Sequence, residues 1–332
     1  MKKIAVFSSH AFEAPYLTEA AKEKFELAFI HEPLSAATVE LARGSDGIAI
    51  FTSDDASKPI LEQLAVQGVF SVATRSAGYD HISLKDAGSL GIKIANVPGY
   101  SPHAIAEFSV ALMLALSRHL KEALQKVNDN DFTIDALTGM NLHHKTAGII
   151  GTGRIGAIVC KILHGFGCRI LATDISPDKS LESSYGVEYV SREELCSQSD
   201  IISIHTPLTE NTTYLLNKEL FSIMKDGVMI INTSRGKIIN TNDLIEALRS
   251  GKAGCAGLDV YENEKEFYFK DYSKKEMKDE TLRTLIGLKN VIVTAHQAFL
   301  TKEALKNIAD TTIMNLDCLL SNKPCSNLLQ AE

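Results

Sequence analysis

The sequence predicts an α/β protein with two doubly wound parallel sheets, on three observations. Short apolar strands alternate with helical segments through the first hundred residues and again from Lys145 onward, which is the pattern of parallel sheets. The rhythm breaks at Val97-Pro98-Gly99-Tyr100-Ser101-Pro102. The chain has 332 residues, enough for two domains of about 150 residues each.

Five apolar segments of the first run are strand candidates. They are Ile4–Phe7, Leu27–Ile30, Gly47–Phe51, Phe70–Thr74 and Ile92–Val97. Ser35–Ala42 and Pro59–Ala65 have helical spacing, and Gly44, Gly68 and Gly91 stand where helix ends favour a left-handed residue. We expect these segments to form one parallel sheet with helices between its strands.

A helix is predicted to begin after Ser101, because serine is a good N-cap and Pro102 suits the first helical position. The pattern continues to about Lys126 and is apolar on nearly every side. Such a helix needs more than one neighbour to bury it. We expect it to be the crossover between the domains and a contact between subunits.

The second run has seven strand candidates and should form a doubly wound sheet. They are Ala147–Ile150, Arg169–Thr173, Val187–Val190, Ile201–His205, Val228–Asn232, Ala256–Val260 and Val291–Thr294. A final helix, from Thr301 to about Ser321, should pack back on the first domain. One domain, residues 101–297, is therefore predicted to be inserted between the two parts of the other, residues 1–100 and 298–332.

A dinucleotide-binding fingerprint opens the second run. The strand Ala147–Ile150 leads into Gly151, Gly153 and Gly156 with Gly-x-Gly-x-x-Gly spacing, and a helix follows. The first glycine allows the tight turn, the second lets the backbone approach a pyrophosphate, and the third lets helix and strand pack closely. Because strand, turn and helix are all in place, residues 101–297 are predicted to be a Rossmann domain.

An acidic residue, Asp174, follows the second strand of this fingerprint. Its carboxylate can accept hydrogen bonds from both ribose hydroxyls, whereas a 2′-phosphate would meet a like charge. The predicted cofactor is therefore NAD rather than NADP.

Three groups that can act on a 2-keto acid follow strands of the second run. Arg235, Glu264 and His296 should meet where the carboxyl ends of parallel strands hold ligands. An arginine can bind a carboxylate with two hydrogen bonds, an imidazolium can protonate a keto oxygen, and a nearby carboxylate keeps the imidazolium charged. Taken singly, each residue is more often an ion-pair partner, a solvated charge or a core histidine. Together they match the reduction of a 2-keto acid by NADH, for which no metal is required.

Composition argues against several other classes of protein. The formal net charge is −7 and no basic block is present, so nucleic acid and anionic membranes are not expected partners. The longest apolar run, Val110–Leu116, is too short to span a bilayer, and Ile4–Phe7 is too short for a signal peptide. Six dispersed cysteines without a Cys-x-x-Cys pair indicate reduced thiols in a cytoplasmic protein.

Five phrases resemble the D-2-hydroxyacid dehydrogenase family, and within it the bacterial fermentative D-lactate dehydrogenases. The phrases are Arg-Ser-Ala-Gly-Tyr-Asp (75–80), Val-Pro-Gly-Tyr-Ser-Pro (97–102), Asn-Thr-Ser-Arg-Gly (232–236), Gly-Leu-Asp-Val-Tyr-Glu-Asn-Glu (257–264) and His-Gln-Ala-Phe-Leu-Thr (296–301). The resemblance covers nearly the whole chain. It implies a flavodoxin-like catalytic domain around the inserted NAD domain, with Arg235 as carboxylate binder, His296 as acid/base and Glu264 as its partner.

The resemblance also implies further site residues. Ala77 and Gly78 would offer backbone donors to the substrate, and Tyr100 and Phe299 would shape its pocket. The residues implied for the cofactor, beside the three glycines, are Arg154, Ile155, Asp174, Thr206, Pro207, Thr233 and Asp259. Gly99 and Gln297 depart from many relatives, which often have alanine and threonine there.

The leading hypothesis is an NAD-dependent D-lactate dehydrogenase that reduces pyruvate, acting as a homo-oligomer (dimer or tetramer). The nearest alternative is a relative acting on branched 2-keto acids, glyoxylate, hydroxypyruvate or phosphoglycerate. The loops of the first domain have no basic cluster for a substrate phosphate, which argues against phosphoglycerate. A hypothesis of another class is a dinucleotide-sensing interaction protein with the same fold. The intact set of Arg235, Glu264 and His296 argues against it.

Overall fold

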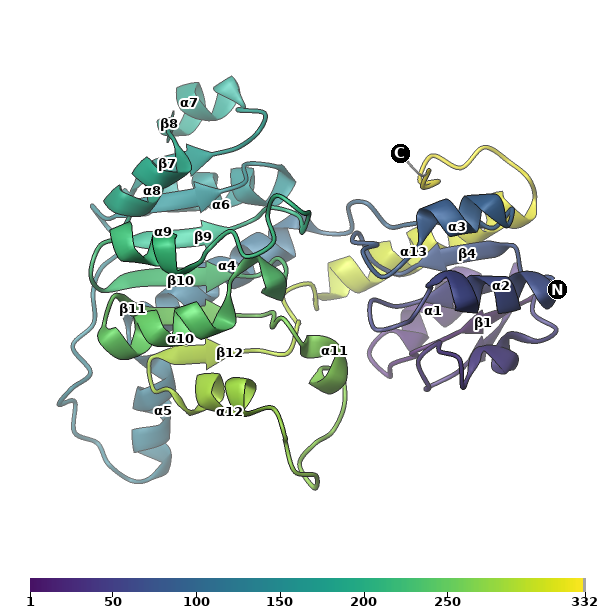
Figure 1. Cartoon of the computed structure of the whole chain (residues 1–332), viewed down its shortest axis with the longest axis horizontal. Coiled ribbons are helices and arrows are strands. Elements are labelled where there is room, and N and C mark those ends of the chain that lie inside the picture. Colours follow the sequence, from purple (N-terminus) through teal and green to yellow (C-terminus); the bar gives the residue numbers. More distant parts are fainter. Residues whose placement is uncertain (331–332) are drawn as a thin grey trace. The chain divides into compact units, whose positions relative to one another are not determined.

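The computed structural model describes residues 1–330, and the chain divides into two compact units (Figure 1). Unit 1 comprises Met1–Ser101 and the segment from Leu300 onward, and unit 2 comprises Pro102–Phe299. The assignment of substrate and coenzyme functions to separate domains stays a prediction at this stage.

Unit 1 is built on a five-stranded sheet in which all neighbouring strands are parallel. The spatial order is β2-β1-β3-β4-β5, with β1 (Lys2–Val6), β2 (Phe25–Phe29), β3 (Gly47–Ile50), β4 (Ser71–Thr74) and β5 (Lys93–Ala95). This is the strand order of the flavodoxin-like fold, as predicted. Helices cover both faces, so that β3 and β4 are buried along their whole length.

The two faces of this sheet carry separate cores. Helices α2 (Lys58–Val66) and α3 (Leu84–Ser89) cover one face, and α1 (Ala14–Ala21) and α13 (Lys302–Leu320) cover the other. Helix α13 lies against α1 and β4 in Figure 1, so the prediction that the tail packs on the first domain is confirmed. The side chain of Thr301 caps α13 by accepting the N–H of Ala304.

One predicted helix of unit 1 is largely absent. Of Ser35–Ala42, only Val39–Ala42 forms a short 3₁₀ helix, η1. The hydroxyl of Thr38 donates to the carbonyl of Pro33 at 2.5 Å and accepts the N–H of Ser35 at 2.9 Å. These side-chain bonds take the place of the backbone bonds that would extend a helix in the N-terminal direction.

Unit 2 is built on seven parallel strands in the order β12-β11-β10-β9-β6-β7-β8. Their bounds are β6 (Thr146–Ile150), β7 (Arg169–Thr173), β8 (Val187–Tyr189), β9 (Ile201–Ile204), β10 (Val228–Asn232), β11 (Ala253–Leu258) and β12 (Val291–Val293). The chain starts in the middle of the sheet, moves to one edge and returns to build the other half, which is the doubly wound Rossmann order. This prediction is confirmed.

Helices again cover both faces of the sheet. One core contains α4 (Pro102–Ser117), α6 (Arg154–Gly165) and α7 (Lys179–Tyr185). The other core contains α8 (Arg192–Gln198), α9 (Lys218–Ile223), α10 (Thr241–Ser250) and α12 (Glu280–Gly287). Short helix α11 (Glu264–Phe267) begins the loop between β11 and α12.

The predicted single helix from Ser101 to about Lys126 is in fact two helices, α4 and α5 (Leu120–Asn128). His119, between them, has a left-handed backbone with φ 51°, which ends α4 and redirects the chain. Helix α4 packs against α6 and strands β10, β11 and β12, so its many-sided apolar surface is buried as expected. Helix α5 buries none of its residues.

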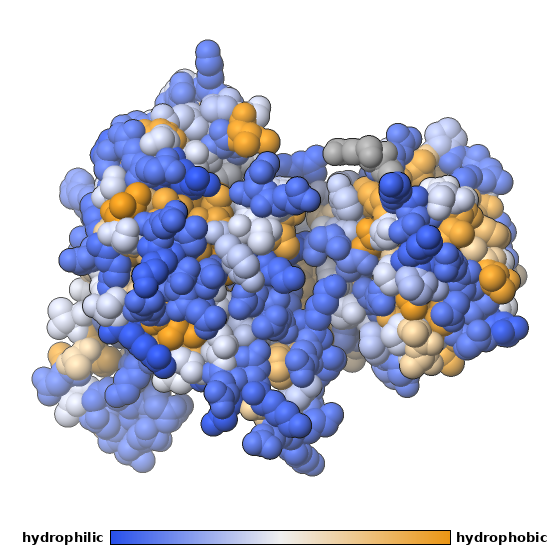
Figure 2. All heavy atoms as spheres, in the orientation of Figure 1, coloured by the Kyte–Doolittle hydropathy of each residue, from blue (hydrophilic) through white to orange (hydrophobic). Residues whose placement is uncertain are grey.

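No helix among residues 1–330 is long and apolar enough to cross a membrane. All six cysteines are free thiols, three of them buried. The face of each unit seen in Figure 2 is mostly hydrophilic, with scattered apolar side chains.

Candidate active site

The glycine turn of unit 2 has the backbone that a pyrophosphate site needs. Gly151 has φ +92°, a conformation that other residues rarely adopt, and a Cβ built on Gly156 would overlap the carbonyl oxygen of Gly151. A Cβ on Gly153 would meet nothing within 4 Å. Helix α6 begins at Arg154 with Gly153 as its N-cap, so the first N–H groups of the helix point into this open space. The turn therefore fits the phosphates of a dinucleotide.

Asp174 lies directly after β7, beside this turn. Its Oδ2 accepts the backbone N–H of Thr152 at 2.6 Å and the Thr152 hydroxyl at 3.2 Å, and its Oδ1 accepts the N–H of Ser176 at 2.8 Å. A carboxylate has about four lone-pair positions, so capacity remains for a ribose hydroxyl. The half-buried side chain is therefore fixed in place and still able to bind a ligand.

The other predicted cofactor residues follow neighbouring strands. Ile155 lies in the first turn of α6, and Thr206 and Pro207 follow β9. Thr233 follows β10, and its hydroxyl lies 2.8 Å from the Ser109 hydroxyl of α4. The placement of these residues at the carboxyl edge of the sheet agrees with cofactor binding, and their contacts with a cofactor stay predictions.

Arg235 stands on a turn that the residues around it hold closely. The side chain of Asn232 donates to the carbonyl of Arg235 at 2.9 Å and accepts the N–H of Ser234 at 3.0 Å. A Cβ on Gly236 would overlap the backbone of Tyr261, so only glycine lets the turn after β10 approach the loop after β11. Arg235 is half-buried, and its Nη1 donates to the carbonyl of Ser234 at 2.9 Å.

His296 and Glu264 form a hydrogen-bonded pair. The Nδ1 of His296 lies 2.7 Å from Oε1 of Glu264, and the other carboxylate oxygen accepts the N–H of Tyr261 at 3.0 Å. The side chains are only 17% and 20% exposed, so water weakens their interaction less than it would at the surface. With Nδ1 bonded to Glu264, Nε2 is the ring atom that can exchange a proton with a substrate.

Asp259 fixes the backbone of the His296 loop by hydrogen bonds. His296 has a left-handed backbone with φ 53°, and its N–H donates to the carbonyl of Asp259 at 2.8 Å. The fully buried Asp259 carboxylate accepts the N–H groups of Gln297 and Ala298 and, at 2.5 Å, the hydroxyl of Thr294. Burial raises the pKa of Asp259, and these bonds oppose the rise. The geometry gives Asp259 a supporting position; whether it also contacts a cofactor stays a prediction.

In unit 1, Ala77 and Gly78 lie on the half-buried turn after β4. The Asn96 side chain donates to the carbonyl of Ala77 at 2.8 Å, and the Ser76 hydroxyl donates to the carbonyl of Gly78 at 2.7 Å. Within residues 1–330, no acceptor takes the N–H of Ala77 or Gly78. The carbonyls are thus fixed by the protein and the two N–H groups are available to an anion, which agrees with the predicted substrate role.

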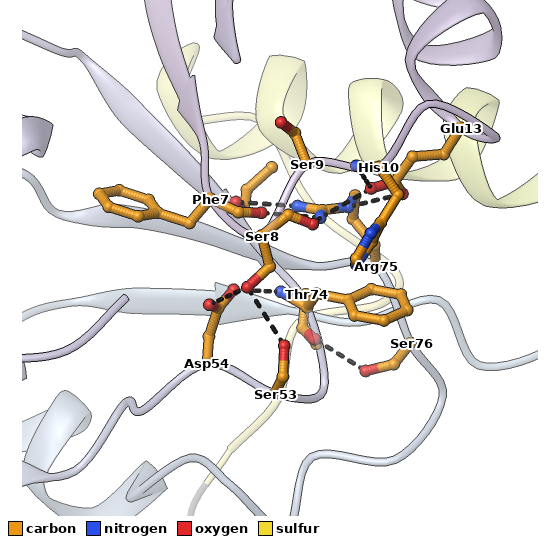
Figure 3. A network of polar contacts seen from close by, with 12 residues as sticks. Phe7, Ser8, Ser9, His10, Glu13, Ser53, Asp54, Thr74, Arg75 and Ser76 are labelled. Atoms are coloured by element: carbon orange, nitrogen blue, oxygen red, sulfur yellow. Dashed lines mark hydrogen bonds and ion pairs between the residues drawn. The ribbon is translucent and has the colours of Figure 1, made fainter. Parts of the chain in front are cut away.

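The ion pair beside this turn, which Figure 3 shows, was not predicted from the sequence. The fully buried Arg75 donates to both carboxylate oxygens of Glu13, at 2.9 and 3.0 Å, and to the carbonyls of Phe7, Ser8 and Ala49. Arg75, which directly follows β4, therefore links the end of this strand to β3 and to the segment after β1. The contacts link residues up to 68 positions apart, and no sequence spacing encodes them.

Two residues predicted to shape the substrate pocket, Tyr100 and Phe299, lie near the boundaries between the two units along the chain. The carbonyl of Tyr100 accepts the side-chain N–H of Asn307 at 2.7 Å, within unit 1. Phe299, the last residue of unit 2, is 8% exposed. Their contribution to a substrate pocket stays a prediction.

His205, which directly follows β9, lies near the glycine turn but in the interior of unit 2. Its ring is buried, its Nε2 lies 2.9 Å from the Ser203 hydroxyl, and burial lowers its pKa to about 3. It is therefore neutral at ordinary pH. Among the described residues no cluster of His, Cys, Asp and Glu could hold a metal ion.

Comparison with known proteins identifies this arrangement. Residues 110–298 match the family model described as D-isomer specific 2-hydroxyacid dehydrogenase, NAD binding domain. The chain is 43% identical to the D-lactate dehydrogenase of Escherichia coli (strain K12) over 328 residues, covering 98% of this chain and 99% of that protein.

Two solved structures are similar to nearly the whole chain. The pyruvate reductase of Chlamydomonas reinhardtii is 39% identical, with a TM-score of 0.92 over 98% of both chains. The D-lactate dehydrogenase of Lactobacillus jensenii, solved with NAD⁺, is 31% identical, with a TM-score of 0.83 over 99% of this chain and 100% of that one.

Proposed function

Because the chain belongs to the D-isomer specific 2-hydroxyacid dehydrogenase family and carries its NAD-binding domain, we propose that it reduces pyruvate to D-lactate with NADH. The observation that supports this most is the 2.7 Å contact of His296 with Glu264 at the carboxyl edge of the sheet that carries Arg235 and the glycine turn. The named relatives include both D-lactate dehydrogenases and a pyruvate reductase, which are two directions of one reaction.

In this proposal Arg235 binds the substrate carboxylate. Its planar guanidinium can form two parallel hydrogen bonds, and the Asn232 bonds keep its turn from moving. The N–H groups of Ala77 and Gly78 donate to the substrate, and Tyr100 and Phe299 surround its methyl group.

His296 is the proposed proton donor. The protonated ring gives the Nε2 proton to the keto oxygen during reduction and takes a proton from the hydroxyl of D-lactate during oxidation. Glu264 stabilises the imidazolium through Nδ1, and Asp259 holds the loop on which the ring stands. NAD, when bound, supplies or accepts the hydride, and the glycine turn, Asp174 and the residues after β9 and β10 would hold it.

Purified protein assayed with NADH against pyruvate, 2-ketoisocaproate, glyoxylate and hydroxypyruvate tests the proposal. We expect the highest kcat/KM with pyruvate, and oxidation of D-lactate but not L-lactate in reverse. A higher kcat/KM for one of the other keto acids would assign the chain to that branch of the family. NAD binding without turnover of any keto acid would instead favour a sensing protein.

We also propose a cytoplasmic homo-oligomer, a dimer or tetramer. Large apolar side chains are exposed on α5 and the loop after it, including Leu124 (66%), Phe132 (73%) and Ile134 (81%). Such neighbouring apolar residues are typical of a surface that a subunit covers. Sedimentation of the wild type and of Leu124→Glu tests this: we expect the variant to dissociate, and a monomeric wild type would contradict the proposal.

A further inference from the structure

A chain of hydrogen bonds ends on the carboxylate of Asp174. Tyr189 is the last residue of β8, and its hydroxyl lies 2.9 Å from the hydroxyl of Thr152 in the glycine turn. The Thr152 hydroxyl in turn lies 3.2 Å from Oδ2 of Asp174. On the other side, the N–H of Asp178, the N-cap of α7, lies 3.0 Å from the Tyr189 hydroxyl.

Donor and acceptor chemistry fixes the direction of this chain. The N–H of Asp178 can only donate, so the Tyr189 oxygen accepts there. An ionised Asp174 can only accept, so Thr152 gives its single hydroxyl proton to Asp174. The bond between the two hydroxyls must therefore use the proton of Tyr189. The alternative acceptor for that proton, the carbonyl of Asp178, is 3.5 Å away, a poor distance for an O–H donor.

We propose that Tyr189 is a positioning residue for the coenzyme: it fixes the Thr152 hydroxyl and, through it, the Asp174 carboxylate that accepts the adenosine ribose hydroxyls. This rests on the ribose role proposed above for Asp174. Thr152 is buried (6% exposed) and lies between Gly151 and Gly153, so the same contact also steadies the turn that faces the pyrophosphate. Tyr189 itself need not touch the ligand.

The contact acts on the adenosine half of the coenzyme and should not affect the reacting half. Loss of the Tyr189 hydroxyl should therefore weaken binding of NADH and of ADP-ribose, which lacks nicotinamide, by the same factor. It should raise the KM for NADH while kcat at saturating NADH changes less than about twofold. One lost hydrogen bond corresponds to about a 2- to 10-fold loss of affinity.

Tyr189→Phe removes only the hydroxyl and is the test variant. Tyr185→Phe is its control, since Tyr185 is also half-buried, packs against His164, and makes no hydrogen bond through its hydroxyl in the described chain. Binding of NADH is measured by its fluorescence and binding of ADP-ribose by calorimetry, with thermal unfolding recorded for each variant. We expect the loss of affinity for Tyr189→Phe alone, with an unfolding temperature within a few degrees of that of the wild type.

Thr152→Ala completes the experiment by a double-mutant cycle. If Tyr189 acts through Thr152, adding Tyr189→Phe to Thr152→Ala should cause little further loss. Fully additive losses would overturn the inference, as would a Tyr189→Phe protein that binds both ligands like the wild type.

Asp174→Ala distinguishes failure of this inference from failure of the ribose assignment on which it rests. If it weakens NADH binding while Tyr189→Phe does not, only this inference is wrong; if it has no effect, the ribose assignment is wrong and the inference with it. Neither result depends on which keto acid is the substrate.

Discussion

The Nδ1 atom of His296 lies 2.7 Å from Oε1 of Glu264, and both residues are held by bonds to the backbone around them. Tyr261 donates its N–H to the second oxygen of Glu264. Asp259 accepts the N–H of His296 with its carbonyl and the N–H groups of the next two residues with its carboxylate. The ring therefore has a fixed orientation and a fixed tautomer when neutral, with its proton on Nδ1. A general acid that is oriented in this way needs little reorganisation before it transfers a proton.

Glu264→Gln keeps the shape of the pair and removes its charge. In the proposed reduction the carboxylate stabilises the charged ring across the 2.7 Å contact, and a neutral amide cannot replace that interaction. The variant should therefore have a lower kcat/KM for pyruvate, by roughly 10- to 100-fold, the equivalent of a hydrogen bond to a charged group worth about 1.5 to 3 kcal/mol. NADH affinity should stay near that of the wild type. The measurement is kcat/KM for pyruvate together with NADH binding, and an unchanged kcat/KM would remove Glu264 from the mechanism.

Arg235→Lys should lower kcat/KM for pyruvate by on the order of 10²-fold or more. A lysine ammonium is a point charge that cannot hold the carboxylate and the carbonyl in one plane, and displacement of the reacting carbon by about 1 Å costs about this much. NADH affinity should stay near that of the wild type, which serves as the internal control. Near-normal turnover by the lysine variant would show that another group binds the carboxylate.

The sequence was most informative where a local pattern and the fold agree. β7 and β10 have the predicted bounds, and α13 begins and ends within a residue of its prediction, because short apolar runs and helical spacing are local signals. Gly44, Gly68 and Gly91 have φ +79°, +82° and +73°, as their positions after helices indicated.

The sequence-based predictions were wrong or incomplete where the structure depends on contacts between residues far apart in the chain. The break between α4 and α5 at His119 was not predicted: histidine adopts a left-handed backbone more often than most residues, but only a few per cent of non-glycine residues do so, and the sequence alone does not show which. Arg75 was recognised only as part of a phrase, because its partner Glu13 is 62 residues away and the pairing exists only in the folded sheet. The bonds from Asp259 to the backbone of the His296 loop likewise exist only in the folded sheet, whereas the place of Asp259 at the end of a strand was predicted.

Substrate choice should be graded by size. If Tyr100 and Phe299 surround the methyl group of pyruvate, each added methylene should lower kcat/KM, by a factor that corresponds to about 1 to 3 kcal/mol. A series from pyruvate through 2-ketobutyrate to 2-ketovalerate measures this. Equal or rising kcat/KM along the series would show that the two aromatic residues do not limit the pocket.

Asp174→Ala should relax the choice between the two coenzymes. The variant loses a charged acceptor for the ribose hydroxyls, worth about 1.5 to 3 kcal/mol, so the KM for NADH should rise about 10- to 100-fold. It also loses the negative charge that opposes a 2′-phosphate, so NADPH should be used no worse than before. Parallel assays with both coenzymes give the ratio, and an unchanged preference for NADH would contradict the assigned role.

Two glycines of the same turn should respond differently to alanine. Gly156 faces the carbonyl oxygen of Gly151, so Gly156→Ala should disturb the packing of α6 on β6 and lower the unfolding temperature even without coenzyme.

Gly153 has a φ of −62°, which alanine also adopts, and a Cβ added to it would meet nothing within 4 Å. Gly153→Ala should therefore unfold at the wild-type temperature. Its defect should appear only when the pyrophosphate must approach the backbone, as an NADH affinity lower by on the order of tenfold, or about 1.4 kcal/mol. Thermal unfolding with and without NADH measures both effects, because a ligand stabilises the folded protein by an amount that grows with the logarithm of its concentration divided by Kd. If Gly153→Ala gained as much stability from NADH as the wild type, the coenzyme would not pass close to this residue.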